Sequence, residues 1–301
     1  ASYAQFGHGG ALSRGSQTSD ITITSAQNLT FRGGSGARSY AQLGTGGWES
    51  ENSKSGSVNI GRVNDIIFEG GSGTNSYAQL GQGGLEVMSG SHSGAINIGA
   101  ANDISFNGGP AIGTYAQLGQ GGSRTNANLS GDISIDAAND LRFESGSENE
   151  SQARLGHGGG TGSHNGSIVI GRVNDITLIA KSNAPVSTLP FFSGPIGEAR
   201  IGHTTTNGTV DGTIAIQRAH DVLLDSTQPS SGAALIGHRG SDTSGDIDVE
   251  ARNLNVAAGF GSQLVRPVFT RTNPGDAGVG HSGNQVSGDI NVGLSGDLDM
   301  T

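Results

Sequence analysis

Short runs of alternating apolar and polar residues recur along the whole chain. Ile133 and Ile135 alternate with polar neighbours, and Leu141 and Phe143 do so again after Asn139-Asp140. Alternation with a period of two predicts a strand that buries one face, and an Asn-Asp pair is typical of a turn. Matching pairs of strands are predicted at Ile21/Ile23 with Leu29/Phe31, Ile96/Ile98 with Ile104/Phe106 and Ile168/Ile170 with Ile176/Leu178. No segment shows a sustained helical period, so the pattern predicts an all-β protein.

A second pattern, Tyr-Ala-Gln-Leu-Gly-x-Gly-Gly, marks an internal repeat. Its glycine before the variable position stands at Gly7, Gly44, Gly81, Gly119, Gly156, Gly202, Gly237 and Gly280. The first four steps between these glycines are 37, 37, 38 and 37 residues, and the later steps are 46, 35 and 43 residues. We therefore predict eight repeats in a single repeat region, 1–301, which is regular over 1–178 and carries inserted loops over 179–301.

A strand of about four residues cannot by itself bury one face and also find partners for the backbone hydrogen-bonding groups on its edges. The repeats are therefore expected to stack in register. This stacking predicts a right-handed parallel β-helix, or β-solenoid. Tyr40–Gly44 resembles Ser57–Gly61 in pattern, which favours two rungs per repeat; one wide rung per repeat is the alternative. The chain begins and stops inside repeat elements, and we expect the parent protein to continue in both directions.

Composition narrows the class of protein. Gly contributes 54 residues and Pro only 7, without the Gly-x-y period of collagen. The formal net charge of -10 with scattered basic residues argues against nucleic-acid and anionic-membrane partners. The chain has no cysteine and no apolar run of the length of a membrane span. We expect any export signal to lie outside this sequence.

The repeat resembles those of a known family. Tyr-Ala-Gln-Leu-Gly-His-Gly-Gly units separated by Ser-Gly-Asp-Ile-x-Ile and Asn-Asp-Leu-x-Phe blocks look like the shaft of filamentous-haemagglutinin-like exoproteins, including biofilm-matrix adhesins of the two-partner secretion pathway. The resemblance covers essentially residues 1–301. It implies a secreted protein of the cell surface or matrix of a Gram-negative bacterium. It also implies export through an outer-membrane transporter and roles in adhesion, aggregation or polysaccharide binding.

Histidine recurs directly after the marker glycine and could be read as a metal site. The histidines concerned are His8, His157, His203, His238 and His281. With two rungs per repeat, neighbouring imidazoles would lie about 10 Å apart, too far to share an ion. We therefore expect hydrogen-bonding turn residues and no metal.

An Asn-Asp pair precedes the second predicted strand of many repeats. The asparagines are Asn64, Asn102, Asn139 and Asn174, and the aspartates are Asp65, Asp103, Asp140 and Asp175. We interpret the aspartates as turn residues and the asparagines as an internal amide ladder. Calcium at the aspartates is an alternative that no calcium-binding motif supports; no other cofactor is expected.

Two departures from the repeat carry aromatic and basic residues that could bind a partner. The candidates are Phe191, Phe192, Phe260, Arg266, Phe269 and Arg271. Loops on a rigid scaffold often carry recognition, and the alternative is that these loops only cover the shaft. Tyr40, Tyr77 and Tyr115 are further candidates, either as an outward binding stripe or as side chains packed inward at a corner.

These observations favour a non-catalytic adhesin or matrix shaft that attaches to polysaccharide, surface glycan or other copies of itself through repeated weak contacts. One alternative is a polysaccharide lyase or glycoside hydrolase on a β-helix, which would need a unique acidic or basic cluster in a cleft. Another is a purely structural surface filament. The acidic positions recur in most repeats, which points to stacking rather than to catalysis.

Overall fold

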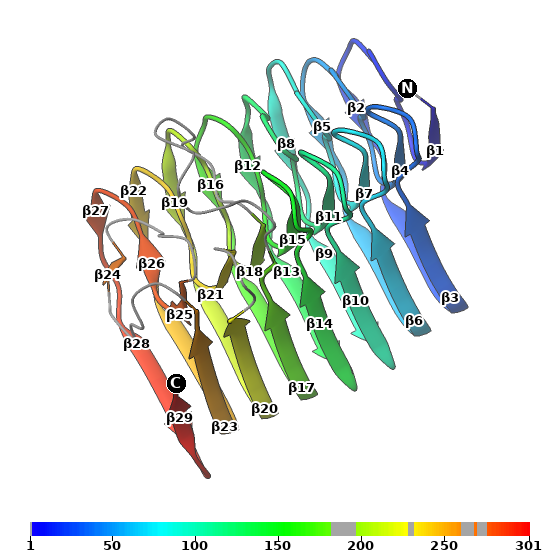
Figure 1. Ribbon diagram of the computed structural model, residues 1–301. Coiled ribbons are helices and arrows are strands. Elements are labelled where there is room, and N and C mark those ends of the chain that lie inside the picture. Colours follow the sequence, from blue (N-terminus) through cyan, green and yellow to red (C-terminus); the bar gives the residue numbers. More distant parts are fainter. Residues whose placement is uncertain (1, 182–196, 228–231, 260–267, 270–275) are drawn as a thin grey trace.

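The computed structural model describes residues 2–181, 197–227, 232–259, 268–269 and 276–301. Within these ranges the protein is all-β, without a helix, and its strands form three long parallel sheets and one two-stranded sheet. Figure 1 shows the strands of each sheet following one another from the N-terminal to the C-terminal end of the molecule. The expected β-helix-like, all-β architecture is confirmed. No helix suited to crossing a membrane occurs in the described ranges.

The first sheet, here called the motif sheet, is built from the Tyr-Ala-Gln-Leu segments and their equivalents. Its strands, in spatial order, are β1 (Tyr3–Phe6), β4 (Tyr40–Leu43), β7 (Tyr77–Leu80), β11 (Tyr115–Leu118), β15 (Gln152–Leu155), β18 (Glu198–Ile201), β21 (Ala233–Ile236) and β25 (Ala277–Val279). Spatial order and sequence order coincide, as stacking of successive repeats requires.

The second sheet, the narrow sheet, has strands of two or three residues. They are β2 (Gln17–Thr18), β5 (Lys54–Ser55), β8 (Ser91–Ser93), β12 (Asn128–Ser130), β16 (His164–Asn165), β19 (Thr209–Asp211), β22 (Asp242–Ser244) and β27 (Gln285–Val286).

The third sheet, the long sheet, holds both predicted strands of each repeat. Its strands are β3 (Ile21–Arg32), β6 (Val58–Glu69), β9 (Ile96–Ala100), β10 (Asp103–Asn107), β13 (Ile133–Ala137), β14 (Asp140–Glu144), β17 (Ile168–Ile179), β20 (Ile214–Ser226), β23 (Ile247–Ala258), β28 (Ile290–Leu294) and β29 (Leu298–Met300). The separate pair is β24 (Val268–Phe269) with β26 (His281–Ser282).

The two predicted strands of a repeat are continuous in some rungs and interrupted in others. The single strand β6 pairs with both β9 and β10, and β17 pairs with both β13 and β14. The hydrogen-bonded path through these six strands therefore closes on itself. In the continuous strands, the segment that was expected to form a turn between two strands is a bend within one long strand.

The expectation of two rungs per repeat is wrong. Tyr40 pairs with Tyr3 on one side and Tyr77 on the other, one full repeat away in each direction. The similar segment around Ile60 lies in the long sheet and pairs there with Ile23 and Ile98. Alternation predicts which residues of a strand share a face, but it does not say which of three sheets the strand joins.

The main core consists of ladders of identical or similar apolar residues. Phe31, Phe68, Phe106 and Phe143 stack with ring centroids 5.0, 4.7 and 4.5 Å apart. Ala and Leu of the motif sheet face them from the opposite side of the same cluster, for example Ala78 and Leu80. Each fully buried Leu, Ile or Phe contributes about 1.5–3 kcal/mol of burial free energy, which is what holds such short strands together.

The motif sheet is buried on both faces. All four residues of β4, β7 and β11 are buried, because the glycine-rich segment after each strand folds back over the Tyr and Gln side chains. Only glycine permits this close approach. At Gly44, which has φ +144°, an added Cβ would lie 2.0 Å from the carbonyl oxygen of Gly81 in the next rung.

Candidate binding groove on the long sheet

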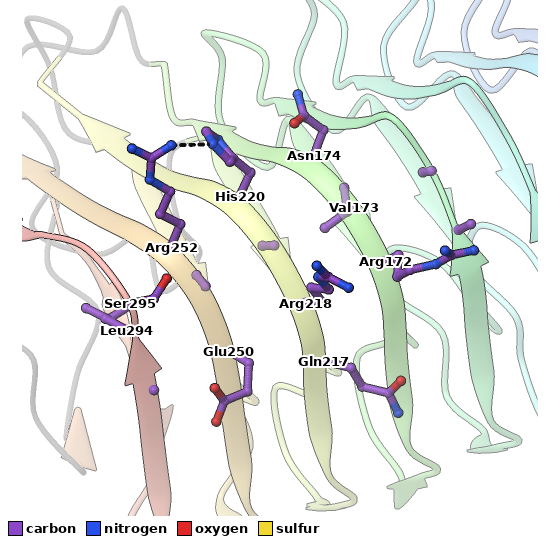
Figure 2. Close-up of a pocket in the computed structure, with 15 residues that line it drawn as sticks. Arg172, Val173, Asn174, Gln217, Arg218, His220, Glu250, Arg252, Leu294 and Ser295 are labelled. Carbon is purple, nitrogen blue, oxygen red and sulfur yellow. Dashed lines mark hydrogen bonds between the residues drawn. The ribbon is translucent and has the colours of Figure 1, made fainter.

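A shallow groove of about 780 Å³ crosses the outer side of the long sheet and runs over five successive repeats. Its floor and walls come from β13, β17, β20, β23 and β28, together with residues that directly follow β13 and β28. Figure 2 shows Arg172, Arg218 and Arg252 on three neighbouring strands of this surface. Because the groove runs across the strands, it follows the direction in which the rungs stack.

The groove lies where the long strands bend. Val173, Ala219 and Ala251 are aligned in register and are only 6–7% exposed, so small apolar side chains form the floor. Arg172 and Asn174, on either side of Val173, are both exposed. The pairing of β20 with β23 shifts register between Ile216 and Ala219. Such an irregularity redirects side chains and makes room for a concave surface.

Two arginines of the groove have no carboxylate partner. Arg172 and Arg218 are paired in register on β17 and β20, so their backbones lie about 4.8 Å apart. Within the described part of the chain, neither guanidinium makes a hydrogen bond or ion pair, whereas several other exposed arginines pair with a carboxylate. Those pairs include Arg32 with Glu69, Arg124 with Glu86 and Arg142 with Glu144.

A third cationic residue, Arg252, is tied to His220. Its guanidinium donates to His220 Nε2 over 2.8 Å, and since arginine only donates, Nε2 must carry the lone pair. His220 Nδ1 is then the protonated nitrogen and lies 3.1 Å from Asp221 Oδ2. His220, Asp221 and Asp175 offer ligand atoms within 4.8 Å of one another. The imidazole nitrogen that faces the carboxylates is, however, already a donor, which opposes a metal ion at this place.

The aspartates of the Asn-Asp positions form an outer row beside the groove. Asp65, Asp103, Asp140, Asp175 and Asp221 are stacked in register on successive rungs. Burial, followed by the charges of Asp140 and Asp221, raises the pKa of Asp175. The row is therefore a strip of like charge, in which the neighbouring carboxylates disfavour ionisation of Asp175.

The expected internal amide ladder is corrected by the structure. Asn64, Asn102, Asn139 and Asn174 are all exposed. Their side chains bond across rungs, but mainly to aspartate: Asn102 Nδ2 donates to Asp65 and Asn139 Nδ2 donates to Asp103. The long strand bends at the asparagine, and the bend turns its side chain outward. The alternation of the first predicted strand does not predict this bend.

The tyrosine candidates lie inside the molecule. Tyr40, Tyr77 and Tyr115 are at most 2% exposed and stack at centroid distances of 4.7 Å. The inward alternative holds and the outward binding stripe is wrong, because the glycine-rich segments cover this face. Of the loop candidates, Phe191, Phe192, Phe260, Arg266 and Arg271 lie outside the described residues. The backbone of Phe269 pairs with Ser282.

Four of the five histidines after the marker glycine, all but His8, form side-chain hydrogen bonds in the structure, as expected. His157, His203, His238 and His281 stack at centroid distances of 4.3, 4.9 and 4.9 Å, so the expected spacing of about 10 Å is wrong. In each of them Nδ1 faces a backbone N–H of the preceding rung and Nε2 faces a glycine carbonyl. Both ring nitrogens are thus occupied by the backbone.

The groove arginines were not predicted from the sequence, although a signal was present. Gly61-Arg62-Val63-Asn64-Asp65 returns as Gly171-Arg172-Val173-Asn174-Asp175 and, more loosely, as Gln217-Arg218-Ala219-His220-Asp221. Arginines at the same place in successive repeats lie next to one another only if each repeat pairs with the next in register. The expectation of two rungs per repeat implied a different pairing of the strands.

The chain matches no protein-family model, no curated protein and no solved structure.

Proposed function

We propose that the chain is the shaft of an extracellular, non-catalytic adhesin that attaches to polysaccharide through repeated weak contacts. The observation that carries the proposal is the groove along the stacking direction, where polar side chains recur on successive strands. A repetitive ligand can engage such a surface at several rungs at once, and linked weak contacts add up to a useful affinity.

The lining of the groove favours binding over hydrolysis. Glu250 is the single carboxylate among the residues that line it. Glycoside hydrolysis ordinarily needs two carboxyl groups, about 5–9.5 Å apart, on either side of the scissile bond. The small side chains of the floor and the amides of Asn174 and Gln217 suit sugar hydroxyl groups, which both accept and donate hydrogen bonds.

The finer features of the proposal come from the resemblance and the repeat spacing. We infer a right-handed solenoid of eight repeats, of the filamentous-haemagglutinin-like type, exported by a two-partner secretion transporter of a Gram-negative bacterium. Its place would be the cell surface or the extracellular matrix, where copies could also associate with one another.

The test is to incubate the purified chain with a panel of insoluble polysaccharides and to measure co-sedimentation and newly released sugar ends in the same tubes. We expect co-sedimentation without release. Release that Glu250→Gln abolishes would replace the adhesin with an enzyme. Neither binding nor release, with the far-ultraviolet β spectrum intact, would leave a purely structural filament.

A further inference from the structure

We propose that the groove binds an anionic polysaccharide, with Arg172 and Arg218 holding its carboxylate or sulfate groups; this assignment rests on the proposed function and names its ligand class. The two guanidinium groups stand on adjacent strands in register, without an internal counter-charge among the described residues. Because paired backbones are about 4.8 Å apart, both arginines can reach anionic groups that one glycan chain carries.

Arg172 and Arg218 differ from Arg62, which also makes no ion pair among the described residues, because they are paired with each other in register, whereas Arg62 lies between Ser25 and Ala100. Acidic residues outnumber basic ones, 26 to 16, over the whole chain. The carboxylate nearest in the lining, Glu250 on the next strand, makes no ion pair with Arg218 among the described contacts. A planar guanidinium binds carboxylate or sulfate through two parallel hydrogen bonds, which an isolated ammonium group cannot do.

The spacing of the arginines suits a chain that lies along the groove. Neighbouring strands are about 4.8 Å apart, close to the length of one hexose unit in an extended polysaccharide. Charges on the same edge of successive sugars would therefore meet successive strands. Asn174, Gln217 and Ser295 line the same groove and offer partners for the hydroxyl groups between the charges.

A nucleic acid fits this surface less well. No Phe, Tyr or Trp lines the groove for base stacking, and stacking on such rings is usual in the binding of single strands. The aspartate row with Asp140, Asp175 and Asp221 runs beside the groove in register. A polymer charged along its whole backbone would be repelled by this row, whereas a glycan charged on one edge can keep its charges on the arginine side.

The experiment measures binding of the chain to immobilised polygalacturonate, dextran sulfate, neutral dextran and duplex DNA at several salt concentrations. The double variant Arg172→Ala/Arg218→Ala is compared with Arg62→Ala. Arg62 occupies the corresponding position in the same Gly-Arg-Val-Asn-Asp sequence, is exposed, and lies between Ser25 and Ala100, outside the groove. All three positions are on the surface, so circular dichroism should show the same fold for every variant.

We expect binding to one or both anionic glycans that weakens as salt rises and falls about 100-fold in the double variant, roughly tenfold for each arginine. Arg62→Ala should bind like the unaltered chain. Preference for polygalacturonate or for dextran sulfate would distinguish carboxylate from sulfate.

Three results would overturn the assignment. Binding to neutral dextran that the arginine variants leave unchanged would refute the ligand class while the proposed attachment to polysaccharide stands. Binding confined to duplex DNA would refute both. An equal loss in Arg62→Ala would show a diffuse charge effect without a site.

Discussion

The Nδ1 atom of His203 accepts a hydrogen bond from the backbone N–H of His157, one rung away, over 2.8 Å. The Nε2 atom of His203 faces the carbonyl oxygen of Gly166 over 2.8 Å and donates to it. In an earlier rung Gln120 does the same with its amide: Oε1 accepts from the N–H of Gln82 over 2.5 Å and Nε2 donates to Gly94 over 2.7 Å. Histidine and glutamine are therefore chemically equivalent in this ladder, and the imidazoles must stay neutral.

The histidine ladder should make the protein sensitive to acid. Burial lowers the pKa of His203 to about 4, and it lowers the pKa values of His157, His238 and His281 as well. Between the unfolded value, about 6.5, and the folded value, the unfolded chain binds more protons. Stability should thus be complete above about pH 6.5 and fall towards pH 4, by at most about 1.4 kcal/mol per pH unit for each histidine. Urea unfolding at pH 7.0 and 4.5 measures this; equal midpoints would contradict it.

Replacing His203 by glutamine should reduce that acid sensitivity. The amide supplies the same acceptor and donor without a group that titrates, as Gln82 and Gln120 already do. We expect His203→Gln to unfold near the unaltered chain at pH 7.0 and to lose less stability at pH 4.5. His203→Ala, the control, should be destabilised at both pH values, because a backbone N–H and a carbonyl lose their partner. A His203→Gln variant as weak as His203→Ala would contradict the equivalence.

The marker glycines should tolerate no side chain. In Gly81→Ala the new Cβ would lie 2.1 Å from the carbonyl oxygen of Gly119, in a backbone that cannot move without opening the rung. We expect loss of more than about 3 kcal/mol of unfolding free energy, or insoluble protein. Gly15→Ala is the matched control: its φ is also positive, +101°, but nothing lies within 4 Å. It should cost only about 1 kcal/mol, and a similar loss in both variants would refute the steric explanation.

The tyrosine ladder should contribute to stability and not to binding. Tyr77 is fully buried between Tyr40 and Tyr115, with ring centroids 4.7 Å away on each side. Tyr77→Ala should cost about 3–5 kcal/mol, as for other buried aromatic residues, while Tyr77→Phe keeps the stacked ring and should cost much less. Thermal unfolding distinguishes the two. Weaker glycan binding by a Tyr77→Phe variant of normal stability would restore the tyrosines as contact residues.

The buried carboxylate of Glu198 should make a large contribution to the stability of the protein. Its buried carboxylate lies 2.9 Å from Arg200 Nε, 3.2 Å from an Nη atom of Arg239 and 3.6 Å from one of Arg154. Burial opposes its charge, but the three arginines hold the pKa of Glu198 well below its usual range. Glu198→Gln leaves buried guanidinium groups uncompensated and should cost about 3–5 kcal/mol. Glu69→Gln, which breaks the exposed pair with Arg32, should cost far less, because solvent screens the charges of an exposed pair. Equal unfolding midpoints for the two variants would contradict the difference.

Much of the architecture was readable in the sequence. The alternation of Ile133 with Ile135 and of Leu141 with Phe143 predicted strands whose apolar residues are indeed buried. The return of Gly7, Gly44 and Gly81 at steps of 37 residues predicted in-register stacking, and the structure pairs these segments. Alternation depends only on residues close together in the chain, and a constant repeat length is found by comparing the sequence with itself, so neither requires knowledge of the fold.

The candidate site was not readable in the same way. Whether Tyr77 faces solvent depends on a glycine segment that folds back over the motif sheet. Whether Arg172 meets Arg218 depends on the register of strands a repeat apart, and a longer step separates these two residues than separates most repeats. The sequence by itself determined the strands, the repeat and the apolar core, through short-range periodicity. Only the tertiary structure decided the single rung per repeat, the burial of the tyrosines and the arginine groove, because these follow from which distant backbones pair and which surfaces cover one another.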